Sequence, residues 1–149
     1  MAIIAIWIFI VGRHNDPWVI GEAPMDVRTA KSILILEDEP LIALEHDEIV
    51  ERAGFTQVTI FSECAAAHAW LKLNTPTAAL LDVRLRDGPC SDVATLLRNK
   101  GVPFVVCSGS SKDDVDPAFR HGIWVSKPCI PEDLIAALTQ AKAEVASQA

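Results

Sequence analysis

From Ser32 onward, short apolar runs alternate with longer segments in which apolar positions recur at helical spacing. The runs predict five strands, at 32–37, 57–61, 77–82, 103–109 and 122–128. The segments between and after them predict five helices, at 40–54, 62–73, 91–101, 113–122 and 131–145, of which the fourth is short and polar. Such alternation is typical of a parallel sheet with helices on both faces. The pattern therefore predicts an α/β fold with a doubly wound, five-stranded parallel sheet.

Residues at the helix ends support this division of the chain. Pro40 suits the first turn of the first predicted helix, and Gly54 suits its end. Ser62 stands where the N-cap of the second helix is expected.

The N-terminus differs from the rest of the chain. Its apolar run at 1–11 is too short to span a bilayer, which takes about 20 residues, and it lacks the basic start of a signal peptide. Because ordered α/β patterning begins only near Ser32, we expect residues 1–24 to lie outside the natural protein, with Met25 as its start. The expected organisation is an N-terminal extension at 1–30, without stable membrane insertion, and one domain at 31–147.

Charge and cysteine content narrow the function classes. The net charge of −7 argues against a nucleic-acid binder, which needs a basic face. Four widely spaced cysteines without a C-x-x-C pair disfavour a zinc site or a disulfide framework, and so predict reduced thiols in a cytoplasmic protein. They are Cys64, Cys90, Cys107 and Cys129. The four histidines lack ligand spacing and receive no role.

Polar residues stand at the carboxyl ends of four predicted strands, and parallel strands bring such ends to one edge of a sheet. They are the acidic run 37–39, Asp82, Ser108, and Lys127 with Pro128. Clustered carboxylates repel one another unless a cation neutralises them, and oxygen ligands suit Mg²⁺. Lys127 and Ser108 would then donate to phosphoryl oxygens. Asp82 is the candidate nucleophile, because aspartyl phosphate is an established covalent intermediate.

Each of these features also has a simpler interpretation. The acidic run suits the start of a helix, where negative charge is favourable. Ser108 and Gly109 make an ordinary turn, Lys127 an ordinary surface lysine, and Trp124 an ordinary core residue. Their coincidence at corresponding strand ends favours a functional site over four separate accidents.

Four stretches resemble the receiver domains of two-component response regulators, in order and over residues 31–146. They are "ILILEDEPLIAL", "LLDVRL", "VVCSGS" and "WVSKP". The resemblance implies a flavodoxin-like fold. It also implies that Glu37 and Asp38 hold Mg²⁺, that Asp82 is the phospho-acceptor and metal ligand, and that Arg84 offers its backbone carbonyl to the metal.

The same resemblance implies a switch. Ser108 matches the hydroxyl that follows phosphorylation, Lys127 the lysine of the site, and Trp124 the aromatic switch position, where Tyr or Phe is usual. Pro128 would follow Lys127 through a cis bond. The loop after Asp82 departs from the family, since "DVRLRDG" is shorter by two residues and lacks the usual proline.

The resemblance implies a stand-alone receiver that takes a phosphoryl group from a sensor histidine kinase or phosphotransfer protein. It would signal through a downstream protein partner that the sequence does not name, and catalyse only its own phosphorylation and dephosphorylation. The alternative is a Mg²⁺-dependent phosphatase with an aspartate nucleophile. That class usually carries D-x-D, whereas the second residue after Asp82 is Arg84.

Overall fold

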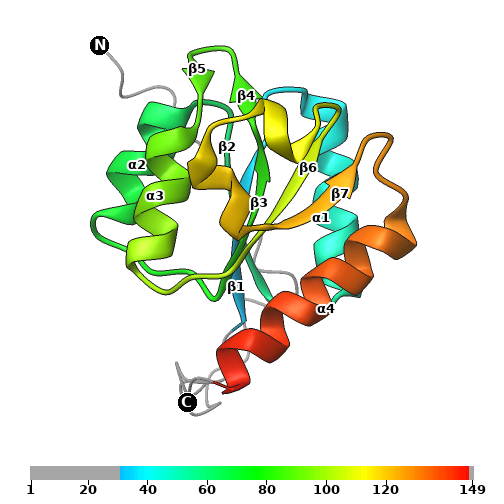
Figure 1. Ribbon diagram of the computed structural model, residues 1–149. Helices are drawn as coiled ribbons and strands as arrows, with labels where there is room; N and C mark the ends of the chain where they lie inside the picture. The colour runs from blue at the N-terminus through cyan, green and yellow to red at the C-terminus, as the bar shows by residue number, and fades with distance from the viewer. Residues whose placement is uncertain (1–30, 148–149) are drawn as a thin grey trace.

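The computed structural model describes residues 31–147, which fold around a five-stranded parallel sheet (Figure 1). Its strands are β1 (Ser32–Leu36), β2 (Gln57–Phe61), β3 (Ala78–Asp82), β6 (Phe104–Ser108) and β7 (Ile123–Ser126). They lie in the order β2-β1-β3-β6-β7, and every neighbouring pair is parallel. The predicted flavodoxin-like fold is confirmed.

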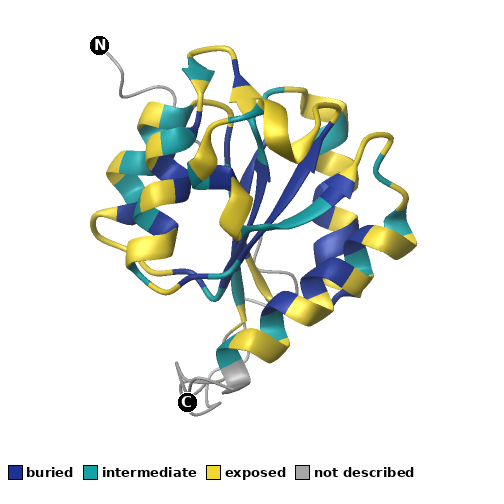
Figure 2. Ribbon diagram, in the orientation of Figure 1, coloured by how far each residue is buried: buried dark blue, intermediate teal, exposed yellow. Residues whose placement is uncertain are grey.

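Helices cover both faces of the sheet (Figure 1). One face packs against α1 (Pro40–Arg52) and α4 (Pro131–Ser147), and the other against α2 (Cys64–Leu71) and α3 (Ser91–Asn99). Buried positions lie along the strands and on the inner sides of the helices (Figure 2). This burial on both faces explains why the strands are continuous apolar runs rather than alternating polar and apolar residues.

Successive strand residues nevertheless divide between the two faces. In β1, Ile33 and Ile35 pack on the face of α1 and α4, whereas Leu34 and Leu36 pack on the face of α2 and α3. This alternation decides which face each side chain at the strand ends approaches.

The segment between β6 and β7 differs from the expectation. We predicted one helix at 113–122, but the structure has two short 3₁₀ helices, η2 (Lys112–Asp114) and η3 (Pro117–His121). Pro117 lacks a backbone N–H and disfavours helical geometry at Asp116. Asp116 instead caps η3, because its Oδ1 accepts a hydrogen bond of 2.9 Å from the backbone N–H of Ala118. Phe119 is the one buried residue of the two 3₁₀ helices, so no apolar face favours a full α-helix.

The start of α2 also corrects a prediction. Its N-cap is Glu63 rather than Ser62, and Glu63 makes no capping hydrogen bond. The carboxylate of Asp87 accepts from the backbone N–H groups of Cys64, at 2.9 Å, and Ala65, at 3.0 Å. Asp87 lies at the turn of a small antiparallel hairpin, whose strands are β4 (Arg84–Leu85) and β5 (Gly88–Pro89). The cap of α2 therefore comes from the loop that follows β3.

The cysteines form two disulfides, so the prediction of four reduced thiols is wrong for this structure. Cys64 bonds to Cys90, and Cys107 bonds to Cys129, across 26 and 22 residues of sequence. Sequence spacing did not indicate these pairs, because each is created by the fold. The first joins the starts of α2 and α3, and the second joins β6 to the loop after β7.

The predictions made for the N-terminal extension fall on residues outside the described range. Within residues 31–147, no helix combines the length and the apolar character needed to cross a membrane.

Gly122 offers a test of the packing between η3 and the sheet. A Cβ at this position would lie 2.6 Å from Cε2 of Phe104 and 2.8 Å from Cγ2 of Val106, both in buried residues. We expect Gly122→Ala to lower the free energy of unfolding by about 1–3 kcal/mol, as overpacking does. Urea unfolding measures the loss. Gly109→Ala is the matched control, since nothing lies within 4 Å of its added Cβ; equal stability of the two variants would contradict the packing described.

Candidate functional site

Three carboxylates meet where β1 and β3 end. Glu37 and Asp38 follow β1, Asp82 is the last residue of β3, and these two strands are neighbours. One carboxylate oxygen from each residue lies within 4.8 Å of the others. The sequence-based expectation that these residues gather at one edge is confirmed.

Lys127 reaches the same cluster from the loop after β7. Its Nζ lies 3.0 Å from Oδ2 of Asp82, and its backbone N–H donates to the carbonyl of Ser108 at 2.9 Å. The Lys127–Pro128 peptide bond is cis, as the resemblance implied. The side chain of Asp82 is 14% exposed and that of Lys127 is 36% exposed. Solvent therefore screens this ion pair in part, and Asp82 remains open to a small reactant.

Glu37 is the most deeply buried member of the cluster, with 3% of its surface exposed. Burial raises the pKa of its carboxyl group, and the charges of Asp82 and Asp38 raise it further. A hydrogen bond of 3.0 Å from the backbone N–H of Glu39 to Oε1, and the charge of Lys127, act in the opposite direction. Oε2 is buried and accepts no hydrogen bond from any described residue.

The donor set of this cluster fits a hard divalent cation. It consists of carboxylate oxygens alone, and an orphaned buried oxygen would gain a partner in the metal. These are three of the four groups that we expected to hold Mg²⁺, the fourth being the backbone carbonyl of Arg84.

Asp82 and Ser108 line the same open cleft of about 530 Å³, together with Arg84 and residues of η2 and η3. Ser108 is 5% exposed, and its Oγ accepts a hydrogen bond of 3.0 Å from the backbone N–H of Ser110. The backbone N–H of Arg84 donates to Oδ1 of Asp82 at 3.3 Å. Each oxygen of Asp82 therefore has one protein partner, Arg84 on one side and Lys127 on the other.

Trp124 lies apart from the carboxylates. Its half-buried indole packs on the face of α2 and α3, and Nε1 donates to the carbonyl of Phe119 at 3.3 Å. The next residue, Val125, packs on the opposite face. Strand alternation thus directs Trp124 toward η3, the element that precedes its strand.

Sequence reasoning missed the contribution of Asp87. The amide groups of Cys64 and Ala65 hold the pKa of its carboxyl group below the ordinary value, against the opposing effect of desolvation. The stretch "RDG" was recognisable as a turn, but its partner on α2 is 22 residues or more away along the chain. Asp87 fixes the hairpin that carries Arg84.

Residues 33–139 match the response regulator receiver domain family. Phyllosphere-induced regulator PhyR of Methylorubrum extorquens is 29% identical over 120 residues, which are 75% of this chain and 43% of PhyR. This chain therefore spans less than half the length of that relative.

Two solved structures are also similar. SdrG from Sphingomonas melonis Fr1 is 36% identical with a TM-score of 0.63, over 78% of this chain and 96% of SdrG. The response regulator PhyR from Brucella abortus is 30% identical with a TM-score of 0.67, over 80% of this chain and 51% of PhyR.

The chain belongs to the response regulator receiver domain family. It is thus a signalling domain of the phosphorylation-dependent two-component class rather than a conventional enzyme. The alternative of an aspartate-nucleophile phosphatase gains no support from these relatives.

The buried charge of Glu37 leads to a prediction about stability. Since its pKa is raised in the folded protein, Glu37 favours folding most when protonated, and this contribution is lost as pH rises through the folded pKa. At pH 7 and without metal, Glu37→Gln should therefore raise the free energy of unfolding by about 1 kcal/mol. The gain should shrink as pH falls, because the folded wild-type carboxyl group takes up its proton at a pH above its ordinary pKa of 4.5. Chemical denaturation across pH measures both effects.

Glu39→Gln is the control for this experiment, because Glu39 is exposed and contributes its backbone N–H rather than its side chain. A Glu37→Gln protein that is less stable than wild type at pH 7 would mean that the carboxylate is structural.

Proposed function

We propose that this domain accepts a phosphoryl group on Asp82 in the presence of Mg²⁺ and signals through the resulting change of its surface. The observation that supports this most is the cluster of Glu37, Asp38 and Asp82 with oxygens within 4.8 Å, one of them 3.0 Å from Nζ of Lys127. Acidic residues that serve only to solvate a protein surface are not expected to cluster beside a lysine at the end of a buried sheet.

The proposed mechanism gives each residue one task. Mg²⁺ would be held by the carboxylates of Glu37, Asp38 and Asp82 and by the backbone carbonyl of Arg84, and it would neutralise carboxylate and phosphoryl charge. A carboxylate oxygen of Asp82 attacks the phosphorus, and the bond between phosphorus and the donor's imidazole nitrogen breaks as the imidazole leaves. Lys127 then exchanges its ion pair with Asp82 for a phosphoryl oxygen.

The proposed switch uses Ser108 and Trp124. When the side chain of Ser108 moves to donate its hydroxyl hydrogen to the phosphoryl group, its Oγ moves away from the Ser110 amide, from which it now accepts a hydrogen bond. This movement alters the space between β6 and η3, where the indole of Trp124 is tethered to Phe119. One local hydrogen bond would thereby bias a two-state rearrangement.

The proposed partners follow from this chemistry. A sensor histidine kinase or a phosphotransfer protein supplies the phosphoryl group, and the site lies in the cytoplasm with these donors. A downstream protein reads the surface built by η3, β7 and α4. The net charge of −7 argues against a nucleic acid as the partner. The domain transforms no substrate other than its own phosphoryl group.

Asp82→Asn tests the assignment of the acceptor. With Mg²⁺ and acetyl phosphate, the wild-type protein should gain one base-labile phosphoryl group, whereas the amide of Asn cannot act as the nucleophile. Asp38→Ala should slow labelling by removing a metal ligand. Intact mass spectrometry measures labelling, with Asp133→Asn on the exposed side of α4 as control. Equal labelling of Asp82→Asn and wild type would refute the proposal.

Trp124 reports on the switch. In a protein with Trp7, Trp18 and Trp70 replaced by Phe, the remaining indole emission should shift when beryllofluoride binds with Mg²⁺, because the contact with Phe119 changes. Fluorescence titration measures the shift. Unchanged wavelength and intensity at confirmed beryllofluoride occupancy would remove Trp124 from the mechanism.

A further inference from the structure

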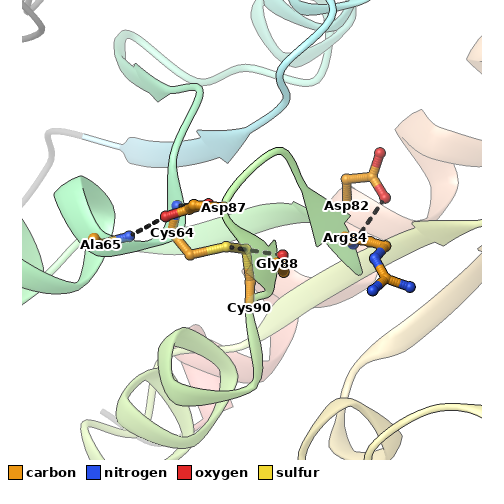
Figure 3. The surroundings of a disulfide bond; sticks show 7 residues. All are labelled: Cys64, Ala65, Asp82, Arg84, Asp87, Gly88 and Cys90. Atoms are coloured by element: carbon orange, nitrogen blue, oxygen red, sulfur yellow. Dashed lines mark hydrogen bonds between the residues drawn. A yellow bond between two sulfur atoms is a disulfide. The ribbon is translucent and has the colours of Figure 1, made fainter.

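The disulfide between Cys64 and Cys90 lies at the base of the hairpin that follows Asp82 (Figure 3). Cys64 is the first residue of α2, and Cys90 immediately precedes α3. Their Cα atoms are 5.3 Å apart, which is ordinary for a disulfide. The bond therefore joins two helices and one end of the loop that carries Arg84.

This loop is tied to Asp82 through a short series of contacts. The backbone N–H of Cys90 donates to the carbonyl of Val83 at 3.1 Å, directly after Asp82. The backbone N–H of Arg84 donates to Asp82 itself. At the other end of the hairpin, Asp87 caps α2 through Cys64 and Ala65 (Figure 3). The disulfide is the covalent member of this set, and the hydrogen bonds made by Asp82 and Asp87 are exposed to solvent.

The bond is also within reach of a reagent. Cys64 is half-buried and lines a groove of about 410 Å³ between α2 and α3, whereas Cys90 lies at the same groove with no exposed surface. The second disulfide also pairs a half-buried residue, Cys129, with a buried one, Cys107, but both pack in the core of the α1 and α4 face and neither lines this groove. A thiolate that enters the groove would meet Cys64 before Cys90.

We propose that Cys64 and Cys90 form a redox-modifiable site for dithiol reductants, and that its state sets the order of the segment 83–90. The consequence for metal binding rests on the function proposed above. In the oxidised state the disulfide holds the hairpin, and with it the backbone of Arg84, beside Asp82. In the reduced state the hydrogen bonds of this segment remain without the covalent link, so the segment 83–90 opens more often.

Thiol–disulfide exchange with a dithiol would open the bond between Cys64 and Cys90 in two steps. A thiolate of the reductant attacks Sγ of Cys64, the disulfide breaks, and Cys90 leaves as a thiolate at the start of α3, where unpaired amides favour negative charge, before it takes a proton from water. The second thiol of the reductant resolves the mixed disulfide. Two electrons pass to the protein, and the reductant becomes a disulfide. The new thiol at Cys64 has the carbonyl of Gly88 within 3.5 Å as an acceptor, so the reduced state is also accommodated.

The first test follows the sulfur chemistry alone. Protein held in dithiothreitol buffers of graded reducing power is quenched with acid, alkylated with N-ethylmaleimide and mapped by mass spectrometry. Cys64 and Cys90 should become alkylated together, under conditions that leave Cys107 and Cys129 bonded. Alkylation of Cys64 in the absence of reductant, or opening of the Cys107–Cys129 bond first, would overturn the assignment.

The second test follows the hairpin. Hydrogen exchange should show faster exchange at the amides of Cys64, Arg84 and Cys90 in the selectively reduced protein than in the oxidised one. A Cys64→Ser/Cys90→Ser protein should match the reduced wild type. A Cys107→Ser/Cys129→Ser protein should keep the redox response. Identical exchange over 83–90 in both redox states would overturn the coupling, whatever the fate of the phosphorylation proposal.

A third measurement separates the two proposals. Calorimetric titration with Mg²⁺ should give a dissociation constant weaker by a factor of about three or more in the reduced protein, because one ligand is less preorganised. No Mg²⁺ binding in either state would overturn the metal site alone, since hydrogen exchange still decides the hairpin. Equal affinity in both states, with a confirmed change in exchange, would overturn the link from hairpin to metal.

Discussion

Repulsion among three carboxylates at one sheet edge is the interaction on which the rest of this domain depends. Glu37, Asp38 and Asp82 have oxygens within 4.8 Å of one another, and negative charges this close repel one another. Lys127 pairs with only one of them. The three negative charges are therefore unfavourable to one another until a divalent cation binds. The folded scaffold, and not the acids themselves, keeps the carboxylates together.

The scaffold consists of a buried apolar sheet, which holds the carboxylates, and a less buried segment beside it, between β6 and β7. β1 and β3 are buried on both faces, and the three acids lie at their carboxyl ends. Beyond β6, two short 3₁₀ helices stand where we predicted a longer helix, and most of their residues are exposed. Segments with little buried surface are the ones that rearrange at small cost. Since Ser108 and Trp124 border this segment, the well-buried part of the domain holds Asp82, the proposed acceptor, and the less buried part lies beside the proposed switch residues.

The sequence predicted the parts of this arrangement that depend on residues close together along the chain, and missed those that depend on distant residues. Apolar periodicity is local, so it predicted every strand of the main sheet and the topology that brings Glu37, Asp82 and Lys127 to one edge. The polar segment after Ser108 had no apolar face, and Pro117 decided its form. The Asp87 cap and both disulfides join residues more than 20 positions apart. No pattern in one sequence specifies such pairs until the packing of α2, α3 and the sheet is known.

The two carboxylate oxygens of Asp82 therefore contact two different parts of the domain. A modification of this carboxylate can change the structure on both sides. Its Oδ1 accepts from Arg84, in the hairpin tied to α2 and α3, and its Oδ2 contacts Lys127, whose backbone is bound to Ser108. A group attached to either oxygen must disturb one of these contacts, and Mg²⁺ would compete for both. The two sides differ in their restraint, because the disulfide that closes the hairpin lines a groove between α2 and α3, whereas the disulfide that joins the Lys127 loop to β6 packs in the core of the α1 and α4 face. A redox change would thus act on the side of Asp82 that faces Arg84, a proposed metal ligand, while phosphorylation would act on the side of Ser108 and Trp124. The proposed acceptor carboxylate is the point at which both effects would meet.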